Sequence, residues 1–144
     1  MKVKVKKLND KAVIPFKTYE RDFCYDVVAT SCEEVAPNIY KYGIGLAFQV
    51  EPNSFEVFSL DFRPRSSVWK TGMVLSNCIG TIDEPYRGEV SAVFYHVMPN
   101  LPKYEVGNRI GQIKIGTTYP IDFVEVEELD PTERNDGGFG STGK

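Results

Sequence analysis

The stretch Arg63-Pro64-Arg65-Ser66-Ser67 places two guanidinium groups and two hydroxyls directly after an apolar segment. Arginine offers planar pairs of N–H donors that match phosphate oxygens, and serine adds a neutral donor. Backbone N–H groups of a turn can join them around an anion. The pattern indicates a phosphate-binding turn, although an ordinary solvated turn uses the same residue types.

A second stretch, NCIGTIDEPYRGEV at 77–90, carries a carboxylate and a phenol close together. Apolar residues precede the turn Asp83-Glu84-Pro85, and Tyr86 follows it, which predicts a β-hairpin with both groups at its mouth. An ionised carboxylate in this position could activate a water molecule, but an aspartate is also a common turn former. Asp26, in CYDVVAT, does not by itself indicate a functional role.

The last seven residues, GFGSTGK at 138–144, fit the spacing G-x-x-x-x-G-K of a phosphate-binding loop. That motif needs a Ser or Thr after the Lys and a helix behind it, and the printed sequence has neither. We therefore expect a Gly- and Ser-rich arm rather than a nucleotide-binding P-loop.

Composition fits one ordinary domain. The chain has 144 residues, of which 42% are hydrophobic, so it can bury a core. Its net charge of −3 gives no long-range attraction to nucleic acid or to an anionic membrane, and we expect stable binding to neither.

Three cysteines without a C-x-x-C pair or a signal-like segment indicate free thiols in a reducing compartment. The expected location is cytoplasmic, within a host cell if the source is viral.

Strand signals dominate the elements that must position these groups, and helical signals are nearly absent. β-Branched and aromatic residues, often alternating with polar ones, fill the segments 1–8, 39–50, 55–62, 72–77, 89–98, 109–115 and 121–129. Turn residues separate them, which predicts an all-β sandwich, jelly roll or barrel. We expect one β domain over residues 1–129 and a Gly-rich arm over 130–144.

Five short segments follow one another in a definite order: YDVVA at 25–29, PRSS at 64–67, GTIDEPYRGE at 80–89, GNRIGQI at 107–113 and RNDGGFGSTG at 134–143. Their order and spacing resemble the five motifs of the homotrimeric dUTP diphosphatase (dUTPase) family, over nearly the whole chain. The resemblance implies a jelly-roll-like β-barrel that assembles as a homotrimer with shared active sites. It also implies hydrolysis of dUTP to dUMP and pyrophosphate with Mg²⁺, which supplies dUMP for thymidylate synthesis and keeps uracil out of DNA. The flexible C-terminal arm is implied to close over a neighbouring subunit's site.

The resemblance assigns roles residue by residue. Asp83 is implied to be the general base that activates the water attacking the α-phosphorus, and Asp26 is implied to hold the metal ion through its waters. Contacts with uracil and deoxyribose are implied for Asn77, Gly80, Thr81, Ile82, Tyr86, Ser91 and Phe139. Contacts with the phosphates are implied for Arg65, Ser66, Ser67, Gln112, Arg134, Gly138, Gly140, Ser141 and Thr142.

The chain departs from the family pattern at a few positions. Cys24, Ser67 and Asn135 stand where the family usually has Gly, and Gly111 stands where it usually has Ala. Pro85 is unusual in the turn of the third motif but suits a turn. None of these changes removes a group to which a catalytic role is assigned.

Two other functions stay open at this point. One is a dCTP deaminase, or a bifunctional relative of it, against which the segment around Asp83 and the complete arm argue; an assay for ammonia release would separate the two activities. The other is a dUTPase-derived interaction protein in which catalysis is secondary. The presence of both the aspartate and the arm favours the active hydrolase.

Overall fold

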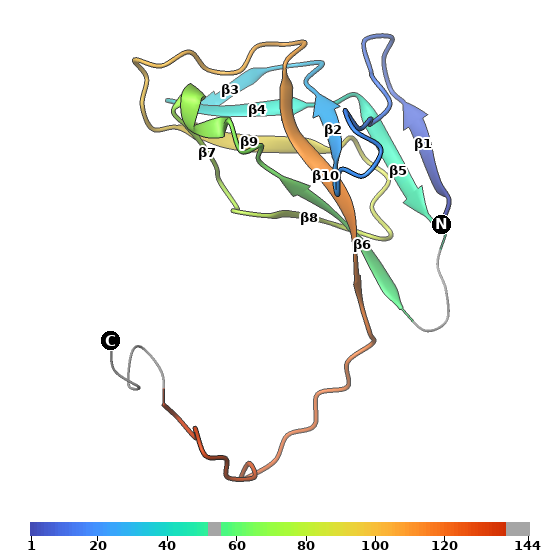
Figure 1. Ribbon diagram of the computed structural model, residues 1–144, viewed down its shortest axis with the longest axis vertical. Helices are drawn as coiled ribbons and strands as arrows, with labels where there is room; N and C mark the ends of the chain where they lie inside the picture. Colours follow the sequence, from blue (N-terminus) through green and yellow to red (C-terminus); the bar gives the residue numbers. More distant parts are fainter. Residues whose placement is uncertain (52–55, 138–144) are drawn as a thin grey trace.

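The computed structural model describes residues 1–51 and 56–137, and within them the chain is built almost entirely from antiparallel β-strands (Figure 1). The strands are β1 (Val3–Lys7), β2 (Tyr25–Val28), β3 (Glu33–Ala36), β4 (Ile39–Gly43), β5 (Leu46–Val50), β6 (Val57–Arg63), β7 (Met73–Leu75), β8 (Gly80–Asp83), β9 (Ser91–His96) and β10 (Arg109–Thr118). The one helical element among the described residues is the 3-10 turn η1 (Val68–Thr71). The all-β, jelly-roll-like fold class expected from the sequence is confirmed.

The strands form three sheets. Two have four strands, in the orders β2-β10-β6-β8 and β3-β4-β9-β7, and the third pairs β1 with β5. Alternate residues of β6 and β9 point into the space between the larger sheets, where Phe62 and Phe94 meet edge to face with ring centroids 6.3 Å apart. Both side chains are fully buried, and burial of a side chain of this size stabilises a fold by about 1.5–3 kcal/mol.

The sheet β2-β10-β6-β8 has one face toward the core and one polar face. Its register places Gln112 of β10 between Asp26 of β2 and Arg63 of β6. Side chains two residues apart on a strand share a face, so this polar face continues along β6 from Arg63 to Asp61 and Ser59. The residues paired with these are Lys114, Thr81, Gly116 and Asp83.

The structure corrects three details of the predicted elements. The segment 39–50 forms two strands, because Gly45 adopts a left-handed backbone (φ +68) that ends the pleat between β4 and β5. The predicted hairpin over 77–90 does not form as a strand pair: β8 pairs with β6, and the following strand, β9, pairs with β4 and β7 in the other sheet. A turn does follow Asp83, whose carbonyl accepts a hydrogen bond from Tyr86 N at 3.0 Å.

The third correction concerns the predicted strand at 121–129. The described residues after Thr118 form no strand, and they run away from the body of the molecule (Figure 1). Apolar side chains along this segment are open to solvent, with Phe123 89% and Leu129 86% exposed. A segment with an alternating pattern forms a strand only when another strand pairs with it. No described segment of the same chain pairs with residues 121–129.

Cys24, Cys32 and Cys78 are free thiols, as expected. Among the helices of the described chain, none is long and apolar enough to cross a membrane.

Candidate active site

A depression of about 560 Å³ opens where β2, β10 and the end of β6 meet the N-terminal loop. Four residues with predicted roles line it: Asp26, Arg65, Ser66 and Gln112. They come from three segments far apart in the sequence, and the sheet register brings them together. The structure therefore gathers the predicted metal-binding carboxylate with three of the predicted phosphate contacts.

Two guanidinium groups hold the Asp26 carboxylate. Arg109 Nη1 donates to Asp26 Oδ2 at 2.9 Å, and Arg65 Nε lies 3.4 Å from Oδ1. The Asp26 side chain is only 14% exposed, so both ion pairs are partly shielded from solvent. Two positive charges against one negative charge leave the depression with a local excess of positive charge, which suits an anionic ligand.

Arg109 is a residue that the sequence reasoning missed, although it lies in one of the five segments. In a regular strand, Arg109 and Gln112 would point to opposite faces, because they are three residues apart. The register shift between Arg109 and Gly111 is a β-bulge, and Ile110 and Gly111 are both buried there. The bulge turns Arg109 to the same side as Gln112. Its basic side chain within the fourth motif was the available signal.

The turn that carries Arg65 and Ser66 is fixed from both sides. Gln112 Nε2 donates to the Pro64 carbonyl at 3.4 Å, and Val68 N donates to the Arg65 carbonyl at 3.0 Å. Ser67, a predicted phosphate contact, is not among the described residues that line the depression; it precedes η1, where its carbonyl accepts from Lys70 N at 3.0 Å.

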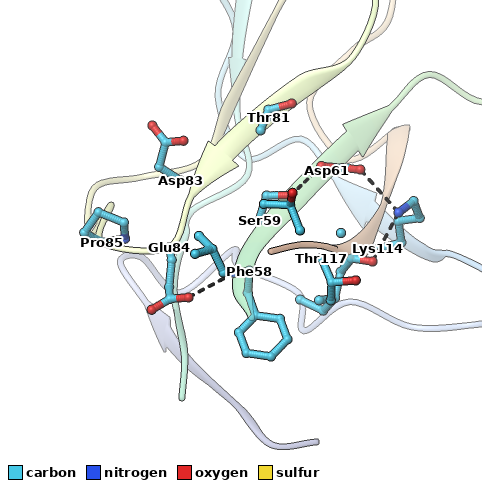
Figure 2. A pocket seen from close by; sticks show the side chains of 13 residues that line it. Phe58, Ser59, Asp61, Thr81, Asp83, Glu84, Pro85, Lys114 and Thr117 are labelled. Atoms are coloured by element: carbon cyan, nitrogen blue, oxygen red, sulfur yellow. Dashed lines mark hydrogen bonds and ion pairs between the residues drawn. The ribbon is translucent and has the colours of Figure 1, made fainter. Parts of the chain in front are cut away.

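Asp83 lies in a second pocket, of about 760 Å³, over β6, β8 and the end of β10. Figure 2 shows Thr81 and Asp83 on one side of this pocket and Lys114 on the other, with Ser59 and Asp61 between them. Asp61 accepts from Ser59 Oγ at 2.9 Å and pairs with Lys114 Nζ at 3.3 Å. The Asp83 side chain is exposed at the end of β8 and is free to meet a ligand from outside.

The predicted base-binding residues are grouped only in part. Asn77 and Gly80 are neighbours, since a Cβ on Gly80 would lie 3.6 Å from Asn77 Nδ2. Ile82 and Tyr86 line a small pocket together with Asp83. Ser91, by contrast, lies in the other four-stranded sheet, opposite Gly43 of β4.

The arm residues do not reach either group within the described chain. Arg134 Nε donates to the Gly137 carbonyl at 2.8 Å, within the exposed arm. The predicted contacts Gly138, Phe139, Gly140, Ser141 and Thr142 lie outside the described residues.

The donor set of the depression fits a magnesium ion that arrives with a nucleotide. Within the described residues there is no group of three or more His, Cys, Asp or Glu side chains that could form a protein cage for a metal. Magnesium commonly takes one or two carboxylates, several waters and the phosphates of its substrate. Asp26 supplies one such carboxylate beside the basic side chains that would contact phosphates.

The family model described as dUTPase matches residues 10–143 of the chain. The deoxyuridine 5'-triphosphate nucleotidohydrolase of Nautilia profundicola is 37% identical over 146 residues and covers 100% of both chains. The protein of the same name from Helicobacter pylori is 35% identical over 147 residues, covering 99% of this chain and 97% of its own.

Two solved structures share the fold. The dUTPase of Staphylococcus bacteriophage 80alpha with dUpNHpp superposes with a TM-score of 0.82 and 22% identity over 99% of each chain. A mutant dUTPase from phage phi11 of S. aureus, described with a structural Mg(II) ion, superposes with a TM-score of 0.74 and 17% identity, covering 91% of this chain and 100% of its own.

Proposed function

The chain belongs to the dUTPase family and is a dUTP nucleotidohydrolase, and we propose that it converts dUTP to dUMP and pyrophosphate at sites that neighbouring copies share. One observation carries this proposal. The phosphate-binding group around Asp26 and the carboxylate of Asp83 lie on the same face of one sheet but in separate pockets. Because a hydrolytic site needs both groups at the same substrate, a second copy of the chain must supply one of them.

The depression around Asp26 binds the triphosphate. Arg65 offers paired N–H donors, Ser66 adds a hydroxyl, and Gln112 adds an amide, all on a wall held by the Gln112–Pro64 hydrogen bond. Arg109 keeps the Asp26 carboxylate in place while Arg65 divides its donors between Asp26 and the ligand. Such a wall orients the chain of phosphates before any bond breaks.

Asp26 would hold a magnesium ion that arrives with the nucleotide. When bound, the ion neutralises phosphate charge and fixes the geometry for in-line attack. The ion is a requirement of the proposal, supported by the donor set at Asp26 and by the structural Mg(II) ion described for the phage phi11 protein.

Asp83 acts as the general base. An exposed carboxylate at the end of a strand can accept a proton from a water molecule placed between it and the α-phosphorus. The rigid pairing of β8 with β6 holds its backbone, with Asp83 opposite Ser59. The phosphate it serves belongs to a substrate in the depression of another copy, in a homotrimer.

Segments next to Asp83 select the base and sugar. Asn77, Gly80, Thr81 and Ile82 present backbone and side-chain polar groups to the uracil edge, and cytosine would leave those groups unpaired. Tyr86 is held by a hydrogen bond from its hydroxyl to the Glu89 carbonyl at 3.1 Å, and its ring packs against deoxyribose. Ser91 keeps its proposed role only if the substrate reaches the start of β9.

The arm completes the site of another copy. From 130 onward it brings Arg134 to the γ-phosphate and Phe139 over the uracil, while the glycines let backbone N–H groups approach the phosphates. Its exposed apolar residues between Tyr119 and Leu129 support a path across a neighbouring subunit, where their burial would offset the cost of ordering the arm.

In the cell the reaction would supply dUMP for thymidylate synthesis and keep uracil out of DNA, in the reducing compartment that the free cysteines suit.

Release of pyrophosphate tests the proposal. With Mg²⁺, the intact chain should release pyrophosphate from dUTP and far less from dCTP, dTTP or UTP, and it should release no ammonia from dCTP. Absence of pyrophosphate release from dUTP by the folded oligomer would leave the interaction protein as the better account.

A further inference from the structure

Asp83 is the last residue of β8, which is the outer strand of its sheet in the described chain. The ladder between β6 and β8 ends on the pair of Ser59 with Asp83, so the next pair along it would be Phe58 with Glu84. That pair does not form, because the chain turns after Asp83. The end of an outer strand is a place where backbone order is usually weak, and a general base there needs something else to hold it.

The side chain of Glu84 takes the place of the missing backbone bond. Phe58 N–H donates to Glu84 Oε2 at 3.0 Å, a contact that Figure 2 draws as a dashed line. In a ladder that continued, this N–H would donate to the backbone carbonyl of residue 84. That carbonyl instead accepts from Arg87 Nη1, inside the turn. The carboxylate therefore extends the pairing of β8 with β6 by one residue, while the backbone already turns away.

Both ends of this contact are well placed. Pro85 favours an extended backbone at the residue before it, and Glu84 lines the same small pocket as Ile82, as expected for residues two apart on a strand. Phe58 is buried on β6, which lies between β8 and β10, and it pairs with Thr117 of β10. Glu84 thus joins the turn to an inner strand of the sheet.

The contact also fixes the direction of Asp83. Consecutive side chains of an extended chain point to opposite sides, and here Asp83 is exposed while Glu84 is half-buried against β6 (Figure 2). A rotation of the backbone that moved the Asp83 carboxylate would pull Glu84 away from the Phe58 N–H. A base must lie within hydrogen-bond reach of its water, and a displacement of about 1 Å can lower the rate about 10²-fold.

We propose that Glu84 is a positioning residue for Asp83: by accepting from the Phe58 N–H in place of a backbone carbonyl, its carboxylate fixes the end of β8 and the direction of the Asp83 side chain. The inference rests on the proposed role of Asp83 as the general base. Glu84 itself touches neither the substrate nor the water in this account.

Glu84→Ala removes the contact. The kcat for pyrophosphate release from dUTP should fall about 10- to 100-fold, because the base is less well placed. The dissociation constant for the non-hydrolysable analogue dUpNHpp should change by less than about twofold, because Gly80, Thr81 and Ile82 keep their pairing with β6. The midpoint of thermal unfolding should fall by only about 2–4 °C, the loss expected for one hydrogen bond, so the variant is still folded in the assay.

Two further variants separate positioning from general loosening. Glu84→Gln keeps an oxygen that can accept from the Phe58 N–H, and it should recover most of the kcat. Glu34→Ala is the matched control, because Glu34 Oε1 accepts from Asn38 N at 3.0 Å beside the β3–β4 pair of the other sheet. This control removes the same kind of side-chain-to-backbone bond and should leave kcat unchanged.

A double-mutant cycle with Asp83→Asn assigns the effect. If Glu84 acts through Asp83, Glu84→Ala causes no further loss of kcat once Asp83 is asparagine. A further loss of the same size, or equal losses in Glu84→Ala and Glu84→Gln or in Glu84→Ala and Glu34→Ala, would overturn the inference. If Asp83→Asn abolishes turnover and Glu84→Ala does not lower it, only the role of Glu84 fails. If Asp83→Asn keeps full turnover, the proposed base itself fails.

Discussion

Asp26 and Asp83 stand at opposite corners of the same polar sheet face. Asp26 faces Gln112 across β2 and β10, and Asp83 faces Ser59 across β8 and β6. Three strand spacings and four residues of strand length separate them, which amounts to about 20 Å. We therefore expect that a substrate phosphate bound at Asp26 does not reach the Asp83 of its own chain, and this distance supports the proposal of a site shared between copies.

Replacing Asp83 by Asn should abolish turnover while leaving the nucleotide bound. Loss of a general base lowers kcat by about 10²- to 10⁴-fold, whereas an amide of the same shape leaves the binding surface intact. Pyrophosphate release and dUpNHpp titration together measure the two effects.

Asp61→Asn is the matched control, because its carboxylate lies on the same face but is engaged by Ser59 and Lys114. This variant should keep kcat near the parent value and lose about 1–3 kcal/mol of unfolding free energy in urea. Equal losses of kcat in both variants would argue against a specific role for Asp83.

Gly111→Ala should destabilise the fold although it restores the residue usual in the family. A Cβ at this position would overlap the ring of Phe62, and Phe62 is fully buried. Overpacking of this kind costs about 1–3 kcal/mol, measured as a lower urea midpoint at fixed protein concentration. Phe62→Leu in the same chain should recover part of the loss, and a strictly additive double mutant would show that the two residues are not coupled.

A chain cut after Asp130 should keep its fold and lose most of its activity. The hydrogen bonds of the removed residues that the structure describes join Thr132, Arg134, Asn135 and Gly137 to one another, not to the body. Thermal unfolding should therefore be unchanged while pyrophosphate release from dUTP falls steeply. Full activity of the shortened chain would mean that the arm takes no part in the site.

Alkaline pH should destabilise the protein through its buried tyrosines. Burial raises the pKa of Tyr42 and Tyr104 above the value of about 10 for an unfolded tyrosine. Their contribution is present in full below that value and is lost as pH rises, by about 1.4 kcal/mol per pH unit for each group. Urea unfolding between about pH 9 and 11 should fall less steeply for Tyr104→Phe than for the parent. Identical slopes would show that the Tyr104 phenol ionises as readily in the folded chain as in the unfolded one.

Local patterns predicted most of the strands. Alternation of apolar and polar residues in the sequence predicted the strands β1, β6, β9 and β10. Burial of one face imposes this period of two wherever a strand covers a core. The same alternation wrongly predicted a strand at 121–129, because a sequence pattern does not show whether the same chain supplies a partner strand. Pairing of β8 with β6 instead of β9 was not predictable from the turn at Asp83, because it is decided by long-range packing.

The residues of the candidate site were likewise predictable only in part. Order and spacing of the five segments identified Asp26, Arg65, Ser66 and Gln112, which the fold then brought together. Arg109 escaped notice because a bulge, and not the regular strand period, places it beside Asp26.

Mixed oligomers of two inactive chains test the shared site most directly. One chain carries Asp83→Asn and the other Arg65→Ala, and the two are co-assembled in equal amounts by joint refolding. If each site takes its phosphate wall from one copy and its base from another, about a quarter of the sites in random mixtures are intact, and pyrophosphate release returns to about that fraction of the parent rate. The same chains refolded separately and then mixed serve as the control and should stay inactive. A joint oligomer with no more activity than this control would mean that each chain builds its site alone, which contradicts the account given for Asp26 and Asp83.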